Sequence, residues 1–139
     1  MLANLLNTNE VKDRTGTEKE FSRILTNNRE TEFALVGEIP SQPTRLYVKH
    51  AESGSGLKKR RQSVVMFRKT VVSDVDNVTP VTGGALLKLD LPVGAMASQT
   101  LALDLLAFVL SFCATTGAAT TVLLDGTGNG AKCLINGDL

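Results

Sequence analysis

The residues best suited to chemistry in this sequence are basic, and they are concentrated in one segment. Residues 41–70 hold eight Lys or Arg against a single acid, Glu52, in a chain of 139 residues whose net charge is only +1. Residues 1–40 carry five cations against seven acids, and residues 71–139 carry two against six. This uneven distribution of charge along the sequence predicts a region of positive electrostatic potential that attracts a polyanion. The alternative interpretation is that these cations lie on an ordinary solvated face.

The basic residues fall into two groups with different expected roles. Arg45, Tyr47 and Lys49 alternate with apolar residues, which predicts one face of a strand on which Tyr47 could stack with a base. Lys58, Lys59, Arg60 and Arg61 follow the flexible turn 53–56 and are expected to contact phosphates. In residues 62–69 the alternation is ambiguous, because Val64 and Met66 are as apolar as Val65 and Phe67. The face of this run that meets a nucleic acid is therefore open.

Groups that could support catalysis or metal binding are sparse. His50 is the lone histidine and has no Cys or acid pair beside it, so neither a zinc site nor a Ser-His-Asp arrangement is expected. The glycines of residues 126–130 do not match a dinucleotide fingerprint, and too little chain follows them. Asp74 and Asp76 belong to a polar loop instead of a desolvated pocket. We expect no enzyme activity, no catalytic residue, no metal and no cofactor.

The elements that position these residues are mostly strands. Ranges that alternate or are rich in β-branched residues, separated by turn residues, predict strands over 5–12, 18–26, 31–39, 45–50, 61–72 and 85–91. The range 74–84, with Pro80 and the pair Gly83-Gly84, is expected to be a loop. Strands followed by helices predict an α+β protein with an antiparallel sheet. The two cysteines, Cys113 and Cys133, fit no disulfide framework, and Cys113 is expected to be a buried, reduced thiol.

Residues 99–115 predict a helix that is apolar over most of its circumference, with Ser98 as N-cap and Gly117 as its end. The run contains Asp104 and is shorter than the ~20 residues of a membrane span, so no membrane partner is expected. No signal peptide is expected at the N-terminus either. One sheet covers only one side of such a helix, which favours cover by a second chain over a monomer core. The expected contact residues are Leu101, Leu105, Leu106, Phe108, Val109 and Phe112.

In its layout the chain resembles the coat proteins of the single-stranded RNA bacteriophages, the leviviruses. The resemblance covers nearly the whole chain and lies in the order and spacing of its parts. These parts are an N-terminal hairpin (5–26), the strand 31–39, the paired basic runs 45–50 and 60–72, a loop with Pro80, the strand end Leu89-Asp90-Leu91-Pro92, the apolar helix and the ending Leu134-Ile135-Asn136-Gly137-Asp138. The Gly/Thr-rich stretch 116–130 departs from the family, which leaves a second helix in doubt.

The resemblance implies a fold and a set of partners. It implies a single coat-protein domain over 1–139, an antiparallel sheet with an N-terminal hairpin, and C-terminal helices that pack across the partner subunit of an intertwined homodimer. It further implies assembly of dimers into an icosahedral capsid, with single-stranded RNA on the inner sheet face. An RNA hairpin at the replicase start would bind there, so that the protein acts as a translational repressor. The protein would be found in the virion, assembled in the cytoplasm of a bacterial host.

Carried over by position, the RNA face would include Arg45, Tyr47, Lys49, Arg61, Ser63, Lys88 and Asp90. The loop 74–84 would correspond to the one that changes conformation around the symmetry axes. Two other functions compete with this interpretation. One is a non-viral, dimeric RNA-binding regulator, which would form dimers without shells. The other is a small enzyme that uses the loop 126–130, which would have to turn over a nucleotide.

Overall fold

The computed structural model describes residues 2–116 and 121–138. The chain forms two compact units, one made of Met1–Glu10 and Lys19–Met96 and the other of Val11–Glu18 and Ala97–Leu139. The first unit is a six-stranded antiparallel sheet, and the second contains two helices and a two-stranded ribbon. The predicted α+β class with an antiparallel sheet is confirmed. The expected single domain and the packing of the helices across a partner subunit stay predictions.

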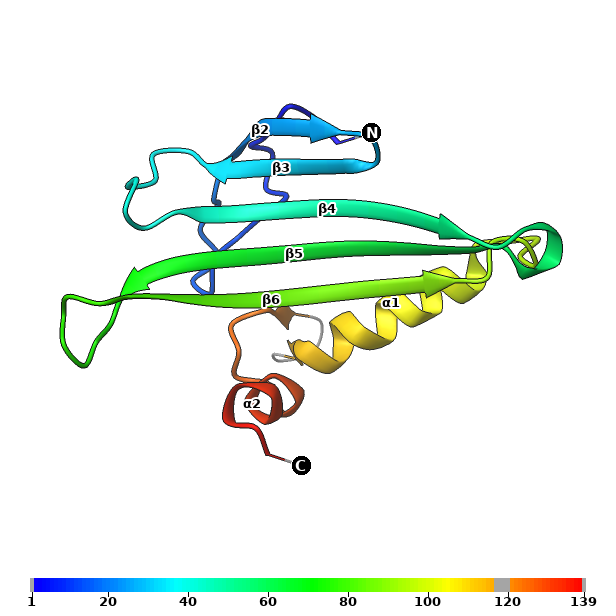
Figure 1. Ribbon diagram of the computed structural model, residues 1–139. Helices are drawn as coiled ribbons and strands as arrows, with labels where there is room; N and C mark the ends of the chain where they lie inside the picture. The colour runs from blue at the N-terminus through cyan, green and yellow to red at the C-terminus, as the bar shows by residue number, and fades with distance from the viewer. Residues whose placement is uncertain (1, 117–120, 139) are drawn as a thin grey trace. The chain divides into compact units, whose positions relative to one another are not determined.

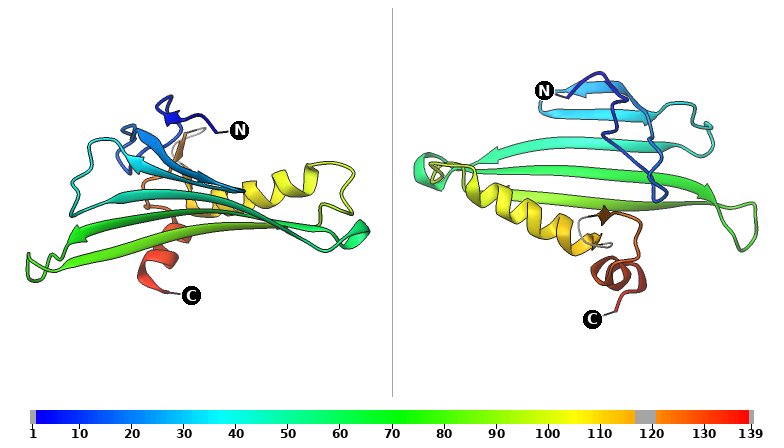
Figure 2. Two further views of the ribbon diagram at one scale, coloured as in Figure 1. Left: turned by 45° about the horizontal axis from the view of Figure 1, so that its top comes forward. Right: turned by 180° about the vertical axis from the view of Figure 1, so that it is seen from behind.

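The sheet follows the order of the chain, so that every strand pairs with its neighbour in sequence (Figure 1). Its strands are β1 (Leu5–Leu6), β2 (Phe21–Asn27), β3 (Glu30–Leu35), β4 (Thr44–Ser53), β5 (Arg60–Val72) and β6 (Pro80–Leu91). The β4–β5 turn and the β5–β6 loop lie at opposite ends of the sheet (Figure 2). The predicted N-terminal hairpin is present, although β1 has only two residues in strand conformation.

Several boundaries differ from the sequence-based expectation, and two of them have a clear local reason. The third strand was expected to run to Ile39, but β3 ends at Leu35, and Gly37 then takes a left-handed φ of 77° that turns the chain. The pair Gly83-Gly84 was expected in a loop, but both residues lie within β6, where they pair with Lys69 and Arg68. Turn residues in a sequence therefore do not exclude a strand when a long partner such as β5 supplies the hydrogen bonds.

The two faces of the sheet differ in character, and the register assigns each side chain to one of them. Phe21, Phe33, Leu46 and Leu91 are buried on one side, which we call the core face. Phe67 belongs to the same face, because its ring meets the Phe21 ring edge-on with centroids 5.9 Å apart. Phe67 and Val65 thus face the core, and Val64 and Met66 face the opposite side. The register thus shows that Val64 and Met66 share a face with Tyr47, an assignment that the sequence pattern left ambiguous.

The second unit contains both helices. Helix α1 (Thr100–Cys113) begins after Gln99, not after Ser98, and Gln99 makes no side-chain cap. The helix ends at Cys113, before the expected stop at Gly117, a residue outside the described ranges. Strands β7 (Thr115–Thr116) and β8 (Val122–Leu123) pair with each other, and α2 (Asn129–Asn136) follows. The second helix that the sequence left in doubt is therefore present.

The glycines before α2 have a packing role. A Cβ on Gly130 would lie 2.0 Å from the backbone oxygen of Phe112, and one on Gly128 would lie 2.6 Å from that of Ala114. Glycine is therefore required for the start of α2 to approach the end of α1. Within the described ranges, neither helix has the length and hydropathy needed to cross a bilayer. Cys113 and Cys133 are half-buried free thiols.

Candidate nucleic-acid interface

The side of the sheet opposite the core face carries most of the predicted RNA-binding side chains, and we call it the basic face. The register places its residues in rows across β3, β4, β5 and β6. One row is Glu30, Lys49, Val64, Lys88; the next is Glu32, Tyr47, Met66, Leu86; the third is Ala34, Arg45, Arg68, Gly84. Side chains within a row therefore lie beside each other on adjacent strands, and side chains in successive rows are diagonal neighbours.

Carboxylates occupy the β3 side of the basic face. Arg45 forms ion pairs with Glu38 and with Glu32, the latter at 3.4 Å. Burial alone would raise the pKa of Glu38, but hydrogen bonds from Arg45 and from the Thr44 backbone N–H hold that pKa below its ordinary value of 4.5. Lys49 pairs with Glu30 at 3.7 Å. The acids from residues 30–38 thus neutralise two cations, Arg45 and Lys49, of the strongly basic segment 41–70.

Tyr47 lies at the centre of the basic face, and its ring is already in contact with a cation. The guanidinium of Arg68 is 5.9 Å from the Tyr47 ring centroid, a cation–π arrangement. Burial and the nearby Glu32 carboxylate raise the pKa of the Tyr47 phenol, against Arg68 and Arg45, which lower it. The phenol therefore stays protonated and can donate a hydrogen bond.

The β5–β6 side of the basic face is richer in free cations. Arg60 pairs with Asp90 at 3.0 Å. Arg68 and Lys88 are exposed and form no ion pair within the described part of the chain. Between them lie the half-buried Val64 and Met66 and the exposed Leu86, whose side chain is 60% accessible. Apolar surface flanked by two cations suits an unpaired base with its adjoining phosphates.

The β4–β5 turn forms a second cationic cluster. The Glu52 carboxylate forms ion pairs with Lys59, Arg61 and Arg29, with N···O distances of 2.9, 3.2 and 3.3 Å. Hydrogen bonds from Lys59 and Arg61 lower the pKa of Glu52 to about 2. Lys58 is exposed and forms no ion pair among the described residues. One carboxylate thus organises three cations, and the turn keeps a net positive charge.

The structure brings some predicted site residues together and separates others. Arg45, Tyr47, Lys49, Arg60, Lys88 and Asp90 share the basic face. Arg61 and Ser63 lie on the core face, where they pair with Leu91 and Leu89 and contact Glu52 and His50. Arg68 is a basic-face residue that sequence reasoning missed, because the face of 62–69 could not be read without the register. Glu30 and Glu32 were missed for the same reason.

Helix α1 exposes the apolar surface that the sequence assigned to a partner. The helix, described over its whole length, has no buried residue. Phe108 is 66% accessible and Phe112 is 56% accessible. Leu101, Leu105 and Val109 are also exposed, and Leu106 is half-buried. Contact of these residues with a second chain stays a prediction.

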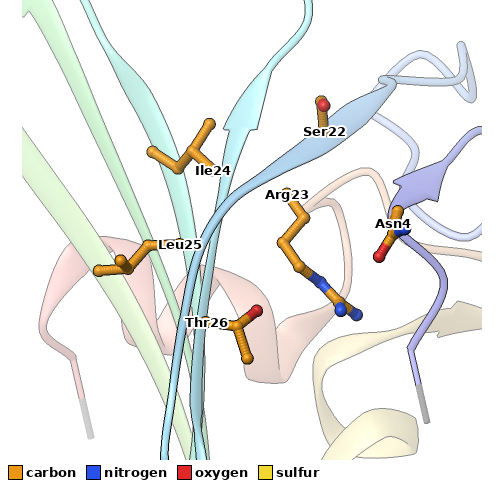
Figure 3. Close-up of a pocket in the computed structure, with 6 residues that line it drawn as sticks. All are labelled: Asn4, Ser22, Arg23, Ile24, Leu25 and Thr26. Carbon is orange, nitrogen blue, oxygen red and sulfur yellow. The ribbon is translucent and has the colours of Figure 1, made fainter.

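Other potential sites contain no reactive arrangement. His50 Nδ1 lies 2.8 Å from the Ser63 hydroxyl, and no carboxylate completes a triad around that pair among the described residues. Within residues 2–116 and 121–138, no three His, Cys, Asp or Glu side chains gather as metal ligands. An open hollow of about 380 Å³ beside β2 is lined by Asn4 and residues 22–26. Figure 3 shows Arg23 extending towards the N-terminal segment that carries Asn4, where Arg23 donates to the backbone oxygen of Leu2, so this cation anchors that segment.

Comparison with known proteins places this geometry among phage coat proteins of known structure. No protein-family model and no curated protein matches the chain. Two solved structures do: "Virus-like particle of bacteriophage AVE015", with 16% identity, a TM-score of 0.56 and coverage of 86% of this chain and 80% of that one, and "Bacteriophage EMS014 coat protein", with 13% identity, a TM-score of 0.61 and coverage of 87% of both chains. The chain therefore has the fold of these bacteriophage coat proteins.

Proposed function

We propose that this chain is the coat protein of a single-stranded RNA bacteriophage, a homodimer that assembles into an icosahedral shell around RNA. The observation that carries the proposal is the shared fold, which extends over most of this chain and of the two coat-protein structures. The shell, the dimer and the RNA partner go beyond that likeness. Each is supported by a separate feature of the chain.

The dimer is supported by apolar surface that the chain leaves uncovered. Burial of a Leu or Phe side chain is worth about 1.5–3 kcal/mol, which the exposed side chains of α1 forfeit in an isolated chain. Strand β6 is one of the two outer strands of the sheet and has twelve residues, so its outer edge offers a long row of backbone groups. Pairing of two β6 edges would join the sheets, and α1 would pack on the partner.

The RNA partner is supported by the basic face and by the β4–β5 turn. Exposed cations at Lys58, Arg68 and Lys88 provide phosphate contacts, which position RNA without reading its sequence. Tyr47, together with Met66 and Leu86 in the same row across the strands, provides a surface on which an unpaired base could be read. Cations that contact phosphates support general packaging of RNA. A separate surface that reads a base supports selective binding of one genomic hairpin and repression of translation.

Negative-stain electron microscopy and sedimentation of the recombinant protein test the proposal. We expect uniform shells that dissociate to dimers. Dimers that never form shells would favour the non-viral RNA-binding regulator, and a folded monomer at micromolar concentration would contradict the dimer. Nucleotide turnover would be needed for an enzyme.

The repressor role has its own test, a binding titration with the genome's replicase-start hairpin and a scrambled RNA. Tyr47→Ala should cost about 1–3 kcal/mol for the hairpin and less for the scrambled RNA. Equal binding of both RNAs, unaffected by Tyr47→Ala, would leave the sheet as an electrostatic lining and exclude the repressor role.

A further inference from the structure

The two halves of the basic face differ in charge. On the β3–β4 side, the cations Arg45 and Lys49 face the carboxylates of Glu30, Glu32 and Glu38. On the β5–β6 side, the cations Arg60, Arg68 and Lys88 face one carboxylate, Asp90. The positive potential available to a phosphate is therefore concentrated on one half of the face.

Solvent exposure separates Arg45 from the β5–β6 cations, whereas Lys49 is 59% accessible and its partner Glu30 is 41% accessible. Arg45 is 25% accessible, and its two acidic partners are 20% and 17% accessible, so this network is shielded and its charges are mutually satisfied. Arg68 and Lys88 are exposed. To bind RNA, Arg45 would first have to give up two carboxylates, whereas Lys88 gives up only water and Arg68 breaks no ion pair.

The surface between Arg68 and Lys88 fits a base. These residues occupy the first and third of three adjacent rows, with Met66 and the exposed Leu86 in the middle row. The neighbour of Arg68 on β6 is Gly84, which has no side chain to cover the guanidinium. The guanidinium of Arg68 also lies 5.9 Å from the Tyr47 ring centroid, so an arriving base would meet a cation that is already held beside an aromatic ring.

We propose that Arg68 and Lys88 on the β5–β6 half of the basic face are the main RNA contacts, with an unpaired base on Met66 and Leu86. The ion pairs of Arg45 and Lys49 form an acidic boundary that excludes RNA from the β3 side. This inference rests on the proposed RNA-binding function and specifies where on the face it is carried out. Where β6 edges pair, the two β5–β6 halves of a dimer adjoin.

The test compares four variants, each with one cation replaced by the neutral glutamine, in binding titrations at two salt concentrations. The RNA is a short hairpin that has an unpaired loop. Arg68→Gln and Lys88→Gln should each lower the salt slope by roughly one and weaken binding about tenfold at ~0.1 M salt. Arg45→Gln is the matched control, and it should change affinity by less than about twofold, because its shielded guanidinium is held by two carboxylates. Lys49→Gln should give a loss between those of Arg45→Gln and Lys88→Gln, because the ion pair of Lys49 with Glu30 is exposed. Circular dichroism and sedimentation verify that each variant is folded and dimeric.

A fifth variant tests the acidic boundary by a gain of binding, which a misfolded protein cannot produce. Glu30→Gln releases Lys49 and should raise both the affinity and the salt slope. Equal losses in all four neutral variants, or no gain for Glu30→Gln, would overturn the assignment while shells and RNA binding persist. A wild-type protein that forms shells but binds no RNA would overturn both this inference and the RNA part of the proposed function.

Discussion

At the scale of single residues, the charges of this protein act through their neighbours in space. Glu52 is the one acid of residues 41–70, and it holds Arg29, Lys59 and Arg61 around a single carboxylate. Arg29 comes from outside that segment, at the β2–β3 turn. A residue that looks like an exception to the basic run therefore organises part of it.

The Glu52 cluster predicts an acid-sensitive contribution to stability. Hydrogen bonds from Lys59 and Arg61 place the pKa of Glu52 at about 2 in the folded protein, below its ordinary 4.5. The contribution is therefore complete above pH 4.5 and is lost as the pH falls towards about 2. The difference in melting temperature between the wild type and Glu52→Gln should be largest above pH 4.5 and shrink on acidification. High salt should weaken it, because the cluster is solvent-accessible. A difference that does not vary with pH would contradict this role.

At the scale of elements, packing and turn formation explain residues whose types could suggest a functional loop. The glycines of 126–130 resemble a phosphate loop in composition, yet Gly128 and Gly130 allow α2 to reach α1. In the β5–β6 loop, Asp76 accepts hydrogen bonds from the backbone N–H groups of Val78 and Thr79 and from the Thr79 hydroxyl. Those bonds lower the pKa of Asp76 to about 2, and they define a turn.

The glycine contact predicts a specific loss of stability. In Gly130→Ala the new Cβ would lie 2.0 Å from the Phe112 backbone oxygen, so the helices must separate. The free energy of unfolding should fall by about 1–3 kcal/mol, measured by denaturant titration. Gly83→Ala is the matched control, since its Cβ would meet no atom within 4 Å. Similar stabilities of the two variants would argue against a role for close packing.

The β5–β6 loop predicts an effect on assembly without an effect on the dimer. Val75 and Val78 are 95% and 79% accessible, so the loop offers apolar contact surface, and its hydrogen bonds are mostly internal. Deletion of Asp76–Thr79 should leave dimers intact, as judged by sedimentation, and should change the yield, size or stability of shells. Shells indistinguishable from wild type would exclude the loop as an assembly contact.

At the scale of the whole molecule, the main feature is the apolar surface of helix α1, which has no buried residue. The matched pair Phe108→Asp and Ala107→Asp tests whether a second chain covers α1. Both substitutions place a carboxylate in the middle of the helix, but Phe108 loses a large apolar side chain that is 66% accessible, whereas Ala107 loses only a methyl group. Phe108→Asp should abolish the soluble dimer, and Ala107→Asp should leave it, in sedimentation experiments. A stable, folded monomer of Phe108→Asp would show that α1 needs no partner.

Several elements could be predicted from sequence because their causes are local. Alternation separated Arg45, Tyr47 and Lys49 from Leu46 and Val48, and it separated Lys88 and Asp90 from the neighbouring leucines. The run 99–115 predicted a helix because its polar or small residues, such as Thr100, Asp104 and Ser111, recur at helical spacing. Boundaries were less accurate, as at Gln99 and at Gly83-Gly84, because capping and pairing depend on partners that a local pattern does not contain.

The sequence by itself determined the α+β class, the strands, the apolar helix and the concentration of cations in residues 41–70. These depend on side-chain period, turn chemistry and composition, which are properties of short segments. Only the tertiary structure decided which cations remain available to a polyanion. Strand register brought Glu30 and Glu32 beside Lys49 and Arg45, moved Arg61 and Ser63 to the core face, and left Arg68 and Lys88 exposed. Electrostatic interaction depends on distance in space, and the pairing of strands sets that distance.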